Sequence, residues 1–135
     1  MNVIVDTCVW SLALRRRKSS NEDATVMRLR ELINESRAQL LGPIRQEILS
    51  GIASIQHFNT LKNYLSAFPD WVISSADHES AAMFCNQCRS KGIQGSNTDF
   101  LICAIASRHK MSIFTTDKDF THYAKIIPLN LYPLA

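Results

Sequence analysis

The chain has 135 residues and a formal net charge of +3, with 46% hydrophobic and 20% charged residues. This size and composition are typical of one globular domain, residues 1–135, that builds its own core. No run approaches the roughly 20 apolar residues of a membrane span, and we expect no signal peptide. Four cysteines in a chain this long do not indicate a disulfide scaffold, so we expect a cytoplasmic protein in a reducing compartment.

Strand and helix patterns alternate from the start of the chain. Residues 2–6 are apolar and β-branched and end in an aspartate, which predicts a buried strand. The segment 7–17 predicts a helix, and a second helix is expected to begin at the capping-box pattern Ser19-x-x-Glu22. Residues 38–42 predict a short strand, and the proline that follows opens a helix over 43–52.

The helix over 43–52 carries an acidic residue near its apolar side. Ile44, Ile48 and Ile52 recur at every fourth position, so we expect this side to pack inward. Glu47 lies along the edge of that apolar stripe rather than opposite it.

The alternation continues to the end of the chain. In chain order the patterns predict a helix at 54–67, a strand at 71–73, helices at 75–91 and 98–109, a strand at 112–116, a short helix at 118–124 and a strand at 126–131. Pro128 argues for an edge position of the last strand. Strands that alternate with helices predict an α/β fold with a mainly parallel sheet and helices on both faces.

Four acidic residues are each tied to an apolar segment: Asp6, Glu47, Asp99 and Asp117. Two of them follow strands, and ligands of parallel sheets bind beyond the carboxyl ends of the strands. Taken singly, each has a simpler interpretation as a helix cap or a surface acid. If the fold brings the four together, they repel one another, and a divalent cation held by oxygen ligands is the usual remedy.

Clustered carboxylate oxygens are typical of metal-assisted phosphoryl transfer. Mg²⁺ keeps several waters, so a few carboxylates suffice, and one or two ions can activate a water and stabilise the leaving oxygen. No Ser-His-Asp order, Walker lysine loop or glycine fingerprint competes. The pair Cys85-x-x-Cys88 lies inside a predicted helix and has no second pair, so neither a zinc site nor a redox motif is expected.

Four segments resemble, in the same order, the motifs of the PIN-domain ribonucleases, and within them the VapC-type toxins of bacterial toxin–antitoxin pairs. Val5–Trp10 resembles the opening strand with the first acid, and Glu47–Gly51 resembles the helix of the second acid. Asp99–Ala106 resembles the third-acid helix, and Thr115–Phe120 the terminal motif. The resemblance runs from the first strand to the last.

This resemblance implies a three-layer α/β/α fold and cleavage of RNA that depends on magnesium or manganese. It also implies a cognate antitoxin as partner and, commonly, a homodimer. The residues that it assigns to catalysis and metal binding are Asp6, Glu47, Asp99 and Asp117. Of these, Asp6 and Asp99 are expected to be the most direct metal ligands. Secondary roles fall to Asp119 as a peripheral acid and to Thr7 and Thr115 as polar supports.

Basic residues lie near two of the acids. Arg15, Arg16, Arg17 and Lys18 form a cluster at the end of the first predicted helix, and Lys118 follows the last acid. Two interpretations of the cluster stay open, a solvated helix end and a contact with RNA phosphates. Phosphate contacts position a strand without reading its sequence.

Other classes of protein stay open. A receiver-like signalling domain needs a phosphoacceptor aspartate after a middle strand, where Gly42 stands, and a lysine after a late strand, where Asp117 stands. A phosphatase of the Asp-x-Asp type needs an acid at the position of Cys8. A PIN-like binding module without catalysis is disfavoured by the complete acidic set. Incubation of labelled RNA with and without EDTA separates a nuclease from these classes.

Overall fold

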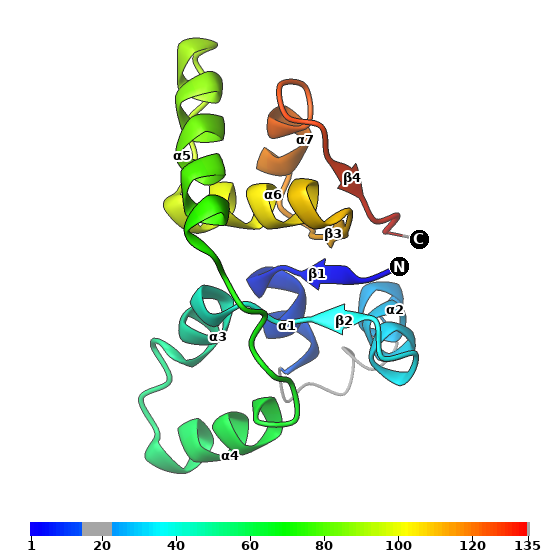
Figure 1. Ribbon diagram of the computed structural model, residues 1–135. Coiled ribbons are helices and arrows are strands. Elements are labelled where there is room, and N and C mark those ends of the chain that lie inside the picture. Colours follow the sequence, from blue (N-terminus) through cyan, green and yellow to red (C-terminus); the bar gives the residue numbers. More distant parts are fainter. Residues whose placement is uncertain (15–22, 135) are drawn as a thin grey trace.

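The computed structural model describes residues 1–14 and 23–134. Four parallel strands form one sheet in the order β2-β1-β3-β4. The strands are β1 (Val3–Val5), β2 (Ala38–Gln39), β3 (Ser112–Phe114) and β4 (Asn130–Leu131) (Figure 1). Every strand pair is parallel, so the predicted α/β fold with a parallel sheet is confirmed.

Seven helices surround this sheet in the described part of the chain. They are α1 (Thr7–Ala13), α2 (Ala24–Asn34), α3 (Gly42–Leu49), α4 (Ile55–Leu65), α5 (Ser75–Ser90), α6 (Asn97–His109) and α7 (Asp119–Tyr123). The connection from β1 to β2 and the one from β2 to β3 cross the sheet in opposite directions. Because such crossovers are right-handed, they place α1 and α2 on one face and α6 on the other. Figure 1 shows α4 and α5 at opposite ends of the molecule.

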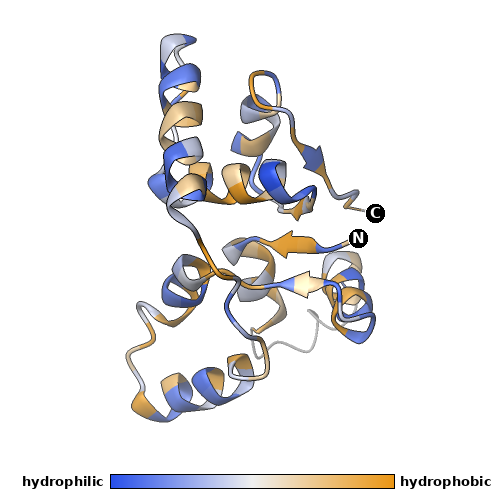
Figure 2. Ribbon diagram, in the orientation of Figure 1, coloured by the Kyte–Doolittle hydropathy of each residue, from blue (hydrophilic) through white to orange (hydrophobic). Residues whose placement is uncertain are grey.

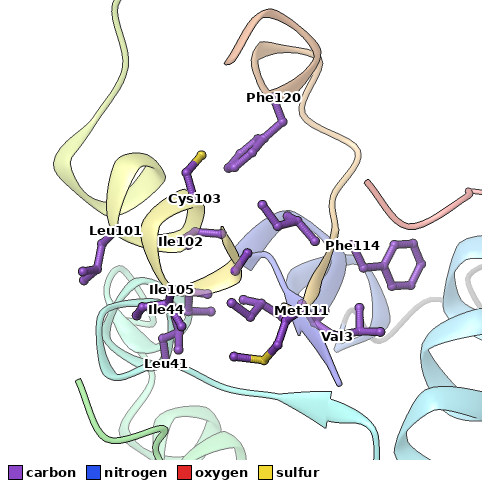
Figure 3. Packing of buried hydrophobic residues seen from close by; sticks show 14 of the residues in the cluster. Val3, Leu41, Ile44, Leu101, Ile102, Cys103, Ile105, Met111, Phe114 and Phe120 are labelled. Carbon is purple, nitrogen blue, oxygen red and sulfur yellow. The ribbon is translucent and has the colours of Figure 1, made fainter. Parts of the chain in front are cut away.

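Helix α6 is the centre of the core. Its residues from Phe100 to Ala106 are all buried, as a helix that is apolar on nearly every side requires. Figure 2 shows β1 and α6 as hydrophobic segments in the middle of the molecule. In Figure 3 the α6 side chains lie among residues of the two central strands, α3 and α7, including Val3, Phe114, Ile44 and Phe120. Each fully buried aliphatic side chain stabilises the fold by roughly 1.5–3 kcal/mol.

The strand predicted at 71–73 is wrong. Among the residues that the structure describes, this edge of the sheet has only an isolated parallel bridge between Leu40 and Asp70. The Trp71 ring instead packs edge-on against His109, and Val72 is 86% exposed. The next residues turn directly into α5, whose capping residue is Ser74.

All four strands are shorter than their sequence patterns, and two of them are reduced to two residues each. The pattern at 38–42 contributes only Ala38–Gln39, because α3 already begins at Gly42. The pattern at 126–131 contributes only Asn130–Leu131, at the sheet edge that was predicted. The backbone N–H groups of residues 126 and 127 donate to the carbonyl of Tyr123 at the end of α7, so they are not available to the sheet.

The helix starts follow their capping residues. Asp23 accepts a hydrogen bond from the Thr25 N–H and caps α2, while the pattern Ser19-x-x-Glu22 lies outside the described residues. Ser96 caps α6, which begins at Asn97, one residue before the predicted start at 98. All four cysteines are free, and none of the described helices has the length and apolar character needed to cross a bilayer.

Candidate active site

The first acid lies where β1 ends and α1 begins. The backbone N–H of Asp6 donates to the carbonyl of Phe114 over 2.9 Å, which ties it to the end of β3. Its Oδ1 accepts the N–H of Thr7 at 2.8 Å and caps α1. Its Oδ2 accepts the hydroxyl of Thr115 at 2.7 Å. Both carboxylate oxygens of this buried residue are therefore held by the fold.

The loop after β3 carries the next two acids. Thr115 Oγ1 accepts the N–H of Asp117 at 3.0 Å, so one hydroxyl positions both Asp6 and this loop. Asp117 Oδ1 in turn accepts the N–H of Asp119 at 2.9 Å, at the start of α7. This local hydrogen bonding places the two aspartates side by side at the carboxyl edge of the sheet.

Asp99 reaches the same edge from α6. Its N–H donates to the hydroxyl of the capping residue Ser96 at 3.1 Å, which places Asp99 in the first helical turn. Its Oδ2 accepts the hydroxyl of Tyr123, from α7, at 2.7 Å. The carboxylate is thus held between two helices that follow different strands.

Glu47 joins the site through a threonine. It is exposed on α3, and its Oε1 accepts the hydroxyl of Thr7 at 2.6 Å. Thr7 is the residue directly after Asp6, so the hydrogen bond links the second acid to the first through one intervening side chain. Thr7 and Thr115, expected as polar supports, each donate to one of the acids.

The most compact acidic group contains a residue that was expected at the periphery. One carboxylate oxygen from each of Asp99, Asp117 and Asp119 lies within 4.8 Å of the other two. Asp6 is not part of this closest group, although it was expected to be a direct ligand. The basic cluster Arg15, Arg16, Arg17 and Lys18 lies outside the described residues, while Lys118 is exposed between the last two acids.

The acids interact electrostatically across the edge of the sheet. Burial raises the pKa of Asp6, hydrogen bonds from Thr115 and Thr7 oppose this, and the negative charge of Asp117 adds to the rise. Burial also raises the pKa of Asp99, against the hydrogen bond from Tyr123 and together with the charges of Asp6 and Asp117. The folded chain therefore holds several carboxylates whose ionised forms destabilise one another.

This donor set fits a hard divalent cation. The closest group offers carboxylate oxygens and no thiol or imidazole, which is the ligand type of magnesium and manganese. A cation at this position would offset the mutual repulsion of the acids. Metal-assisted chemistry on a phosphodiester is the reaction class that such a site supports.

Residues 3–126 match the family model of the PIN domain. The chain belongs to the PIN-domain family. Two curated relatives, a VapC ribonuclease of Mycobacterium bovis and ribonuclease VapC11 of Mycobacterium tuberculosis, are each 30% identical over 131 residues. The match covers 94% of this chain and 95% of each relative. The match to this family does not favour the alternative of a receiver-like signalling domain.

Solved structures show the same PIN fold. FitAcB from Neisseria gonorrhoeae superposes with a TM-score of 0.76 at 20% identity, covering 97% of this chain and 96% of the other. VapBC2 from Rickettsia felis, bound to a promoter DNA fragment, superposes with a TM-score of 0.74 at 17% identity over 98% of both chains. The three-layer PIN architecture expected from the sequence is therefore confirmed.

Two side chains of this PIN domain reach the site without having been predicted. The thiol of Cys8 lies 3.6 Å from Asp6 Oδ2 and 3.4 Å from the backbone nitrogen of Thr116. Tyr123 donates to Asp99 from α7, 24 residues further along the chain. Neither residue carries a sequence signal, because an apolar helix stripe explains a tyrosine and a small hydrophobe explains a cysteine equally well.

Proposed function

We propose that this PIN domain is a metal-dependent endoribonuclease, the toxin of a cytoplasmic toxin–antitoxin pair, that hydrolyses RNA phosphodiesters. The observation that carries the proposal is the meeting of acids from three separate segments at one edge of the sheet: Asp6 after β1, Asp99 on α6, and Asp117 with Asp119 after β3. The curated relatives named as ribonucleases support the RNA substrate.

The residues that would hold Mg²⁺ or Mn²⁺ are Asp99, Asp117 and Asp119, with Asp6 beside them and Glu47 at the rim. A bound divalent cation would acidify a water and offset the charge that develops on the phosphate oxygens. The chain supports this site through hydrogen bonds to its acids. Thr115 holds Asp6, and Thr7 holds Glu47.

The exposed part of the site is where RNA would bind. Glu47 is exposed while hydrogen-bonded to Thr7, so it can meet a substrate that lies across the ends of the strands. Lys118 is exposed between Asp117 and Asp119 and can contact a backbone phosphate. Such contacts orient a single strand and leave its sequence unread.

The proposed partners are a cognate antitoxin and a second copy of this chain. VapBC structures, from Rickettsia felis and from Haemophilus influenzae, share the fold of this chain with TM-scores of 0.74 and 0.72. Co-expression with the antitoxin should suppress the RNA cleavage that this chain causes when it is expressed alone.

A cleavage assay with labelled RNA tests the proposed activity. The wild-type chain should cut RNA in Mg²⁺ or Mn²⁺ and stop in EDTA, and Asp99→Asn should be inactive in both. Glu79→Gln removes an exposed carboxylate on α5 and serves as the matched control, with activity unchanged. Cleavage that persists in EDTA, or in Asp99→Asn at ordinary magnesium, would contradict the proposal.

A further inference from the structure

We infer that Tyr123 is a positioning residue of the metal centre: its phenol holds the Asp99 carboxylate in the orientation that a divalent cation needs. This inference rests on the proposed metal-dependent function. It assigns a role to a residue of α7 that lies outside the four acidic motifs.

The contact joins a buried donor to an acid of the site. Tyr123 has no exposed surface, and its hydroxyl donates to Asp99 Oδ2 over 2.7 Å. A hydrogen bond to an ionised acceptor is short and about twice as strong as one between neutral groups. One oxygen of Asp99, Oδ2, is thereby engaged by the protein.

Two aromatic rings hold the phenol in this direction. The ring centroid of Phe100 lies 5.1 Å from that of Tyr123. The ring centroid of Phe120 lies 5.2 Å from that of Tyr123, and these two rings meet edge-on. Both phenylalanines are buried. The ring of Tyr123 is therefore packed between α6 and α7, and its hydroxyl cannot swing away without opening the core.

The loop before α6 closes over the phenol at a glycine. A Cβ atom at position 95 would stand 2.8 Å from Cζ of Tyr123 and 3.1 Å from Cε2 of Phe100, and closer still to the phenol oxygen. Only glycine fits this approach without a shift of the loop or the ring. The backbone at Gly95 thus packs closely against the Tyr123 phenol.

The hydroxyl of Tyr123 is the donor in this contact, because an ionised carboxylate only accepts hydrogen bonds. A hydroxyl in this setting does not compete with a cation for the site, since it carries no charge. It restricts the carboxylate to one orientation, which is what residues behind metal ligands do.

Calorimetry with Mn²⁺ in the absence of RNA tests the inference. Tyr123→Phe keeps the ring and removes only the hydroxyl, so the Kd for Mn²⁺ should rise on the order of 10–100-fold. Tyr64→Phe on α4, whose ring packs against Phe68, is the matched control and should bind Mn²⁺ like the wild type. RNA cleavage by Tyr123→Phe should recover when the metal concentration is raised.

A second variant approaches the same contact from the loop. Gly95→Ala should weaken Mn²⁺ binding while the hydroxyl is still present, because the added methyl displaces the phenol. In the Tyr123→Phe background the same alanine should cost less affinity, since its closest contact is gone. Fully additive effects of the two changes would contradict the geometry.

The wild-type protein gives a readout that does not depend on any variant folding. The hydroxyl proton of Tyr123 should exchange slowly, and its NMR resonance should shift when Mg²⁺ saturates the site. Wild-type affinity in a folded Tyr123→Phe, or no shift of this resonance on Mg²⁺ binding, would overturn the inference. If the wild type binds no Mn²⁺, the proposed metal centre fails instead, and the two failures are thereby distinguished.

Discussion

The Thr115 hydroxyl donates to Asp6 Oδ2 over 2.7 Å, although 109 residues separate the two in the sequence. The same hydroxyl oxygen accepts the backbone N–H of Asp117 at 3.0 Å. One small side chain at the end of β3 therefore sets the positions of two acids. The parallel pairing of β1 with β3, which places Val5 opposite Phe114, makes this contact possible.

Asp6→Asn should abolish cleavage and leave the fold intact or firmer. Burial and the charge of Asp117 raise the pKa of Asp6, so its ionised form is disfavoured in the metal-free fold, and a neutral amide of the same shape removes that repulsion. We expect the loss of activity to exceed the roughly 10–100-fold typical of residues behind a metal ligand. The Tm in EDTA should stay the same or rise by a few degrees.

The matched control for this change is Asp23→Asn, which alters another aspartate that caps a helix. Asparagine caps helices about as well as aspartate, so both activity and Tm should stay near the wild type. An active Asp6→Asn protein at ordinary magnesium would remove the proposed mechanism.

Thr7→Val should impair catalysis while preserving the fold. Valine has nearly the shape of threonine but cannot donate to Glu47 Oε1, so the carboxylate loses its link to the first acid. We expect the cleavage rate to fall by about 10–100-fold, with the free energy of unfolding changed by no more than about 1 kcal/mol. Thr60→Val removes a hydroxyl that donates to the Gln56 carbonyl on α4 and should leave the rate unchanged. Equal rates for the two variants would argue against a role for Thr7.

A divalent cation should stabilise the protein in proportion to its binding. At a free Mg²⁺ concentration 100 times the Kd, the free energy of unfolding should rise by about 2.7 kcal/mol, and EDTA should reverse the change. The double change of Asp99 and Asp117 to asparagine should remove most of this increment, because it takes two ligands from the closest acidic group. Thermal melts across a magnesium series measure the effect, and an identical series for the double variant would place the cation elsewhere.

Asp77 should make the fold sensitive to acid, independently of the site. Burial raises the pKa of this carboxyl, but hydrogen bonds from Ser74, His109 and Arg108 outweigh burial and lower it to about 2 from 3.8. A folded-state pKa below the unfolded one stabilises the protein above about pH 4, and this contribution is lost as the pH falls towards 2. At pH 7 it amounts to about 2 kcal/mol.

Urea unfolding of Asp77→Asn at two pH values measures this contribution. The free energy of unfolding of the variant should be about 2 kcal/mol below that of the wild type at pH 7. This difference in stability should become smaller at pH 2.5, because Asp77 itself becomes protonated. Glu35→Gln removes a surface partner of Arg37 and should cost under about 1 kcal/mol at either pH. A gap of the same size at both pH values would contradict the assigned pKa.

Sequence patterns predicted the elements that have a strong local signal. The strand predicted before Asp6 and the helices predicted at 75–91 and 98–109 each depend on neighbouring residues, and the structure contains all three. The strand expected at Trp71-Val72-Ile73 failed because β propensity does not create a partner. Within the described part of the chain, the sheet edge at that point offers only the bridge at Leu40, and the indole packs on a histidine instead.

The order of the acidic motifs along the chain was informative, but it did not predict the distances between the carboxylates in the fold. The four motifs predicted one site from Asp6, Glu47, Asp99 and Asp117. The structure groups Asp99 and Asp117 with Asp119, and it links Asp6 to Asp117 through Thr115. Their grouping depends on the turn after β3, where a hydrogen bond to Asp117 brings Asp119 into the closest group and leaves Asp6 beside it. No periodicity or spacing encodes that turn.

By itself the sequence determined the class of fold and predicted a site made of carboxylates, because hydrophobic period and side-chain type are properties of short stretches of chain. Only the tertiary structure decided which partners hold the acids. Tyr123 meets Asp99, and Thr7 meets Glu47, across gaps of 24 and 40 residues. Such pairs arise when helices pack on a sheet, since packing sets distances that no local pattern contains.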